Sequence, residues 1–233
     1  QFTFNQISEL MHNYGSMDIL WLDGGWVRPR ETVNEEVLSW GAPIPEWSQD
    51  IDMPKIAHMA RKAQPGLLMV DRTVHGPYEN YQTPEQRVPA AQLAYPWESC
   101  MTLGGAWGYV SGDQFKSPAK VIHTLIEVVA KGGSLLLGIG PKPDGTLPEE
   151  AVARLKEVGQ WMEKNGAAIY DTRTTKAYQE GNIFFTRNKS GNVQYALVCL
   201  PENEAVPKEV VWKSNLPRKG STIKWLQTGE SEK

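Results

Sequence analysis

The chain has 233 residues and a formal net charge of −3, with its basic and acidic residues interspersed. This length is enough to bury a large core, and the lack of a long run of Lys and Arg argues against a nucleic-acid partner. The apolar stretches, such as residues 121–130, are interrupted or too short to cross a bilayer, so no membrane partner is expected.

Helix and strand patterns alternate in the first part of the chain. Apolar residues at helical spacing predict a helix over residues 2–14, and the short apolar run 19–22 predicts a buried strand. A second helix is expected over residues 52–63, with a second strand at 67–70. This order of helix and strand is typical of an α/β unit.

Two long segments interrupt this alternation. Residues 27–50 and 73–116 lack periodicity and are expected to be loops over the ends of the strands. Ser117 and Pro118 then mark the start of a helix, which Gly132 should end.

A third strand is predicted at residues 134–139, followed by a helix over 148–164. Three alternations of helix and strand favour a parallel sheet. From about Thr172 the pattern changes to short alternating segments, among them 182–187, 193–200, 210–212 and 222–226. These segments predict a second domain of antiparallel strands.

Asp23 is the best catalytic candidate. It follows the strand 19–22 directly and precedes a glycine pair, with Trp21 and Trp26 on either side. Ligands of parallel α/β sheets bind at the carboxyl ends of the strands, and aromatic rings suit the apolar face of a sugar. A lone Asp at this place could also merely cap the following turn.

Other parts of the sequence say less about chemistry. Cys100 and Cys199 form neither a metal-ligand cluster nor a disulfide framework, and both are expected to be buried. We expect no metal and no cofactor, because His, Cys, Asp and Glu do not cluster at ligand spacing. His75 could reach a ligand hydroxyl but as a lone histidine is more often solvated.

Seven motifs in chain order together resemble the α-L-fucosidases of glycoside hydrolase family 29. The resemblance covers roughly the first 170 residues, and its longest motif is quite specific. The motifs are Ile19–Trp26, Val70–Arg72, Tyr81–Glu85, Trp97–Glu98, Trp107–Tyr109, Lys131–Pro148 and Asn165–Tyr170.

The resemblance implies a fold of two domains. Residues 1–172 would be the carboxyl-terminal part of a (β/α)8-like (TIM) barrel, and residues 173–233 the start of a β-sandwich. The amino-terminal part of the barrel, whose strands carry further fucose-binding residues in the family, has no counterpart in this chain. The partial barrel alone would have an exposed sheet edge.

The resemblance also implies a retaining exo-glycosidase that removes terminal α-L-fucosyl residues from oligosaccharides or glycoconjugates, with Asp23 as the nucleophile. Glu85 is our choice for the acid/base and Glu79 its close alternative, because family members differ in where this acid lies. Either glutamate could instead form only a loop salt bridge or a cap.

Further site residues are expected to bind the substrate: Trp21 and Trp107 as aromatic walls, Arg72 beside the nucleophile, and Glu98 as another nearby carboxyl. Taken alone, each tryptophan would more often be a core residue, and Arg72 could instead only pair with Asp71. The substrate class is a fucosylated glycan, and the oligomeric state is left open. Family members suggest a secreted, periplasmic or lysosomal protein.

Two other functions remain compatible with the sequence. One is a non-catalytic carbohydrate-binding protein that keeps the aromatic residues of the same barrel. The other is a related retaining glycosidase that acts on a galactoside, a sugar that differs from fucose mainly at its 6-hydroxyl.

Overall fold

The computed structural model describes residues 1–24, 28–39, 44, 46–47, 49–72 and 77–232. The chain forms two compact units, Gln1–Thr83 and Pro84–Lys233. Within the described residues, the helices are all too short or too polar to cross a membrane.

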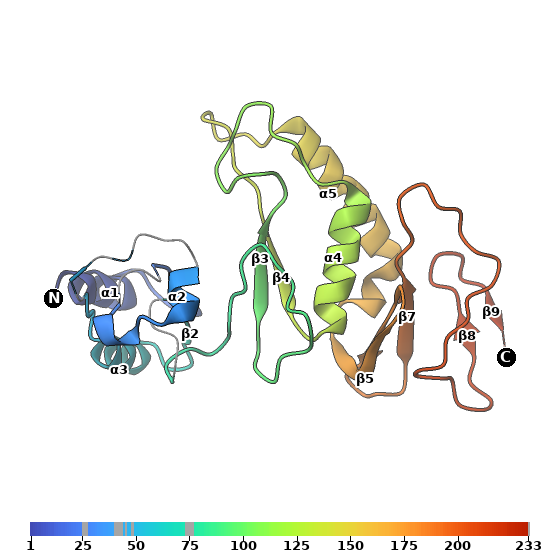
Figure 1. Cartoon of the computed structure of the whole chain (residues 1–233), viewed down its shortest axis with the longest axis horizontal. Coiled ribbons are helices and arrows are strands. Elements are labelled where there is room, and N and C mark those ends of the chain that lie inside the picture. Colours follow the sequence, from blue (N-terminus) through green and yellow to red (C-terminus); the bar gives the residue numbers. More distant parts are fainter. Residues whose placement is uncertain (25–27, 40–43, 45, 48, 73–76, 233) are drawn as a thin grey trace. The chain divides into compact units, whose positions relative to one another are not determined.

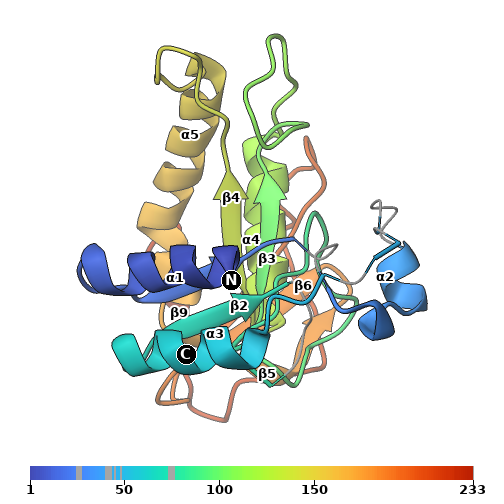
Figure 2. The same cartoon turned by 90° about the vertical axis from the view of Figure 1, so that its left-hand side faces the viewer.

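The first unit is built on two parallel strands. Strand β1 (Ile19–Leu22) pairs with β2 (Leu68–Asp71), in register from Ile19 opposite Leu68 to Leu22 opposite Asp71. Helices α1 (Phe2–Asn13) and α3 (Met53–Ala63) run side by side next to β2 (Figure 2). The predicted helices and strands of this unit are therefore confirmed, to within two residues at each end.

The core of the first unit lies between the helices and the strand pair. Ile7 of α1, Ile56 of α3, and Leu20 and Met69 of the strands are among its buried residues. Full burial of an aliphatic side chain of this size contributes about 1.5–3 kcal/mol, so this shared core fixes the positions of the strand ends. The predicted loop over 27–50 also contains two short helical segments, η1 (Arg30–Thr32) and α2 (Glu35–Ser39).

The second unit begins with another parallel pair, β3 (Glu98–Thr102) and β4 (Ser134–Gly138). Helix α4 (Pro118–Ala130) packs against β4 and against α5 (Glu149–Asn165), as Figure 1 shows. The predicted cap is confirmed, since the Ser117 hydroxyl accepts the N–H of Lys120 at 3.2 Å.

Strand β3 corrects the expectation of a loop over residues 73–116. The other strands of the parallel pairs are predicted from continuous apolar runs. This strand begins with the polar residues Glu98 and Ser99, so it lacks such a run. Residues 99–102 are all buried in the structure. The segment therefore behaves as a strand covered on both faces, although its sequence is only partly apolar.

The rest of the second unit is antiparallel. After the short η2 (Gly166–Ala168), strands β5 (Thr172–Glu180), β6 (Ile183–Asn188) and β7 (Gln194–Val198) form one sheet. Strands β8 (Ile223–Lys224) and β9 (Ser231–Glu232) form a second, small pair.

The prediction of two strands around a turn at 182–200 is confirmed, whereas residues 210–212 form no strand. Strand β5 has no counterpart among the predicted strands. The fold is thus mixed α/β, with two parallel pairs flanked by helices and a following antiparallel sheet. The closed barrel, the β-sandwich and the domain boundary at 172 stay predictions.

Candidate active site

Asp23 lies immediately after β1 in the first unit, and its side chain is 60% exposed. Its Oδ1 accepts the backbone N–H of Gly24 at 2.8 Å. Gly24 has a φ of 113°, a conformation that residues with a β-carbon rarely adopt. A glycine therefore suits this position, directly after the accessible carboxylate.

Arg72 is held beside Asp23 by the pairing of β1 with β2. Its backbone N–H donates to the carbonyl of Leu22 at 3.1 Å, which continues the parallel ladder by one residue. The Arg72 Nη1 then lies 3.5 Å from Asp23 Oδ1, and its guanidinium lies 5.1 Å from the centroid of the Trp21 ring. The structure therefore brings Trp21, Asp23 and Arg72 together, as predicted.

This ion pair does little for stability. Asp23 is mostly exposed, and pairs of this kind contribute about 0–1 kcal/mol. The arrangement instead places a fixed cation, with several N–H donors, next to an accessible carboxylate and an aromatic face. Such a group of side chains can bind a hydroxylated ring and present a nucleophile to it.

Glu85 lies in the second unit, on a short extended segment parallel to β3. The N–H of Cys100 donates to the carbonyl of Pro84 at 3.1 Å, and the N–H of Gln86 donates to the carbonyl of Cys100 at 2.8 Å. The indole N–H of Trp107 donates to Glu85 Oε1 at 2.8 Å. The structure thus joins these two predicted residues directly.

Gly138 is a site residue that the sequence did not reveal. A β-carbon added there would lie 2.7 Å from the Trp107 ring, so the ring rests against the backbone at the carboxyl end of β4. Trp107 itself stays 43% exposed. The sequence signal that could have indicated Gly138 is its place as the glycine that ends an apolar strand.

The other two glutamates lie in different surroundings. Glu79 is buried, with 8% exposure, in the first unit. Glu98 begins β3 opposite Ser134, so about 13 Å of strand separates it from the end of the pair where Gly138 and Trp107 meet. Burial raises the pKa of Glu98 above its ordinary value.

Glu98 lies two residues before Cys100, the β3 residue that pairs with Glu85, but the hydrogen bond from Trp107 goes to Glu85. The role of Glu98, like the roles of the other site residues, stays a prediction. Trp26 and His75 lie outside the described residues. Among the residues that the structure does describe, no three His, Cys, Asp or Glu side chains gather in a group that could hold a metal ion.

Comparison with known proteins agrees with these features. The family model described as alpha-L-fucosidase matches residues 1–167. The plasma alpha-L-fucosidase of Homo sapiens is 27% identical over 203 residues, which cover 84% of this chain and 41% of the human protein. The chain therefore spans less than half the length of this relative.

Solved structures show the same likeness. Alpha-L-fucosidase isoenzyme 1 from Paenibacillus thiaminolyticus matches with a TM-score of 0.66 at 28% identity, over 80% of this chain and 44% of that one. The alpha-fucosidase of Thermotoga maritima in complex with fucose matches with a TM-score of 0.58 at 26% identity, over 79% of this chain and 41% of that one.

Proposed function

Because the chain belongs to the alpha-L-fucosidase family, we propose that the full-length protein is a retaining exo-glycosidase that hydrolyses terminal α-L-fucosyl residues of oligosaccharides or glycoconjugates. The observation that carries this proposal is the accessible Asp23 carboxylate at the end of β1, beside Arg72 and Trp21. The two parallel strand pairs would belong to a (β/α)8-like barrel, and the sheet from residue 172 onward to a β-sandwich.

The first step is the formation of a glycosyl ester. The Asp23 carboxylate attacks C1 of the fucosyl residue while the carboxylic acid of Glu85 gives its proton to the glycosidic oxygen. The bond between C1 and that oxygen breaks, and the rest of the glycan leaves as an alcohol. Glu85 is then a carboxylate.

The second step hydrolyses this ester. The Glu85 carboxylate takes a proton from water as the water oxygen attacks C1, and the bond from C1 to Asp23 breaks. Fucose leaves with the configuration of the substrate, since C1 has been inverted twice. Asp23 is again ionised and Glu85 again protonated.

The neighbouring residues have binding roles in this proposal. Arg72 would donate to a sugar hydroxyl next to the nucleophile, and the rings of Trp21 and Trp107 would contact the apolar faces of the sugar. Glu98 has less support as a substrate contact, because it lies at the other end of the β3–β4 pair from Trp107.

The nucleophile is tested by Asp23→Ala in the full-length protein. We expect turnover of an aryl α-L-fucoside to fall by about 10³-fold or more, since no ester can form. Added azide should restore product as a fucosyl azide of inverted, β configuration, because azide attacks from the side that Asp23 occupied.

Asp18→Ala is the matched control, since Asp18 is an exposed aspartate just before β1. It should keep the wild-type rate. A wild-type rate in Asp23→Ala would rule out Asp23 as the nucleophile.

The acid/base is tested by comparing Glu85→Gln with Glu79→Gln. The true acid's loss should spare aryl fucosides with good leaving groups and strongly slow those with poor ones, because only the latter need a proton. We expect this selectivity in Glu85→Gln alone. Its appearance in Glu79→Gln would move the assignment to Glu79.

Substrate and location follow from the same family membership. Parallel kinetics on aryl α-L-fucosides and aryl galactosides test the sugar specificity, and we expect a clear preference for fucose. The expected location of the full-length protein is secreted, periplasmic or lysosomal, and a relative named plasma alpha-L-fucosidase supports the first of these.

A further inference from the structure

The segment 84–89, which carries Glu85, is anchored from the side of β3. Ser99 is fully buried, and its hydroxyl donates to the carbonyl of Arg87 and lies 3.5 Å from that of Pro84. Because the buried Ser99 hydroxyl would lose its acceptors if the segment moved away, and an unpaired buried hydroxyl is costly, these contacts restrict where the segment can lie. They flank Glu85 on both sides in the sequence.

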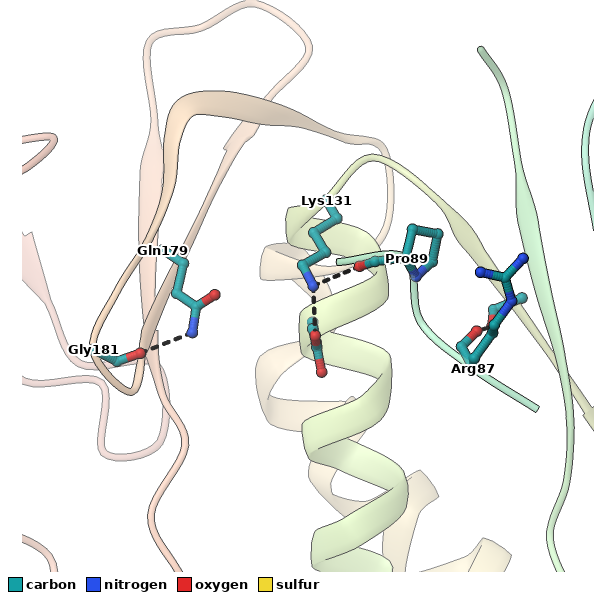
Figure 3. Close-up of polar contacts among 7 residues, drawn as sticks. Arg87, Pro89, Lys131, Gln179 and Gly181 are labelled. Atoms are coloured by element: carbon teal, nitrogen blue, oxygen red, sulfur yellow. Dashed lines mark hydrogen bonds and ion pairs between the residues drawn. The ribbon is translucent and has the colours of Figure 1, made fainter. Parts of the chain in front are cut away.

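A second anchor comes from the end of α4. Lys131 is 4% exposed, and its Nζ donates to the carbonyl of Pro89 at 2.8 Å and to Oε1 of Glu127 at 2.6 Å (Figure 3). An ammonium group withdrawn from water requires such partners. Lys131 is thus committed to the segment 84–89 instead of to solvent.

The helix end fixes the position of Lys131. The N–H of Gly132 donates to the carbonyl of Val129 at 3.0 Å, and the N–H of Gly133 donates to that of Val128 at 2.9 Å. This is the Schellman arrangement, and Gly132 supplies its left-handed residue with a φ of 87°. Lys131 therefore projects from a helix end whose backbone is fully hydrogen-bonded at this turn.

We propose that Lys131 and Ser99 are positioning residues for Glu85, which they hold through the backbone carbonyls of Pro89 and Arg87. The proposal rests on the proposed role of Glu85 as acid/base. Neither side chain is needed to touch the substrate. Their effect comes from geometry, since a misplacement of about 1 Å in a reacting group can cost about 10²-fold in rate.

The test is Lys131→Met in the full-length protein, assayed on a 4-nitrophenyl α-L-fucoside and on a fucosyl disaccharide. We expect kcat on the disaccharide to fall at least about 10-fold more than kcat on the aryl fucoside, with KM little changed, because only the poor leaving group needs a well-placed proton donor. Lys131→Arg should restore most of the loss, since its guanidinium can donate to the same carbonyl.

Gln179→Met is the matched control. The Gln179 Nε2 also donates to a backbone carbonyl, that of Gly181 at 2.9 Å, but in the turn between β5 and β6 (Figure 3). This variant loses one side-chain bond to a carbonyl without touching the segment 84–89. Its rates on the two substrates should stay in the wild-type ratio.

Ser99→Ala is the second variant, and it carries the test if Lys131→Met fails to fold. It removes one oxygen from a buried site and should show the same selective loss on the disaccharide. Thr186→Val is its control, because the fully buried Thr186 hydroxyl donates to the carbonyl of Ala168 at 2.8 Å, away from Glu85's segment.

The outcomes separate this inference from the proposed function. If Glu85→Gln lacks leaving-group selectivity, the assignment of Glu85 fails and the positioning role fails with it. Suppose that Glu85→Gln is selective, but that Lys131→Met and Ser99→Ala either slow the two substrates equally or slow neither substrate. The positioning role alone is then wrong. Selective loss in all three variants supports both.

Discussion

Trp107 donates its indole N–H to Oε1 of Glu85 at 2.8 Å, while its ring rests on the backbone of Gly138. An indole N–H can only donate, so it fixes one carboxyl oxygen as an acceptor. A glycine at the end of β4 allows the ring to approach this closely. One tryptophan thus links the segment that bears Glu85 to the carboxyl end of the β3–β4 pair.

Trp107→Phe should separate this hydrogen bond from the ring. Phenylalanine keeps an aromatic face but cannot donate, and a hydrogen bond to a charged group contributes about 1.5–3 kcal/mol. We therefore expect kcat/KM on a fucosyl disaccharide, whose poor leaving group needs the proton of Glu85, to fall by roughly 10-fold or more. Steady-state kinetics measure this, with Trp225→Phe at a half-exposed tryptophan as the control. An unchanged kcat/KM would show that the indole N–H is not used.

Arg72→Lys should lower activity without lowering stability. Lysine keeps the charge near Asp23 but loses the planar fork and its contact with the Trp21 ring, so we expect a loss of about 10- to 100-fold in kcat/KM. Because such an exposed pair contributes about 0–1 kcal/mol, Tm should change by only a few degrees, about 4 °C or less.

Arg154→Lys is the control for Arg72→Lys. Arg154 lies on α5 and pairs with Glu150 at 3.0 Å, so this change should leave kcat/KM as it is. A large drop in Tm for Arg72→Lys would contradict the functional interpretation and indicate a mainly structural arginine.

Regular elements with strong signals could be predicted from the sequence. The helix that starts at Pro118 has a capping serine, an apolar face and a terminal glycine pair, and all three features appear in α4. Strand β3 had no such signals, because its polar first residues conceal its burial. One weaker signal was present: Leu103 is followed by the glycine pair that begins at Gly104, and a glycine pair also follows closely on β1.

The first half of the candidate site could also be predicted, because its residues follow neighbouring parallel strands. Asp23 and Arg72 meet since β1 and β2 pair in register. The contacts of Lys131 with Pro89 and of Trp107 with Glu85 could not be predicted. They join irregular segments, whose paths depend on tertiary packing that no local pattern encodes.

Gly133→Ala should destabilise the second unit. A β-carbon at Gly133 would lie 2.5 Å from the ring of Trp97, which is 3% exposed and cannot move aside easily. Overpacking of this kind costs about 1–3 kcal/mol. Chemical denaturation should show this loss, whereas the control Gly159→Ala should stabilise α5 by about 0.5–1 kcal/mol, since nothing lies within 4 Å of its added carbon. Equal stabilities of the two variants would contradict this packing.

Glu98→Gln should make stability depend less on pH. Burial raises the pKa of Glu98 above its ordinary value, so the folded state disfavours the ionised form relative to the unfolded state. The stability that the neutral carboxyl contributes is present below the unfolded pKa and is lost as pH rises through the higher folded pKa. Glutamine cannot ionise and escapes this loss.

We therefore expect denaturant titrations to show Glu98→Gln as more stable than the wild type at pH 7, with the advantage shrinking below about pH 4, where the wild-type side chain is neutral as well. Glu209→Gln, at an exposed glutamate, corrects for the general effect of removing a negative charge.

Glu98→Gln also tests the predicted contact of Glu98 with the substrate. If the Glu98 carboxylate binds a sugar hydroxyl, the variant removes a charged acceptor and kcat/KM should fall. Full activity of Glu98→Gln at pH 7 would therefore show that the predicted contact is wrong.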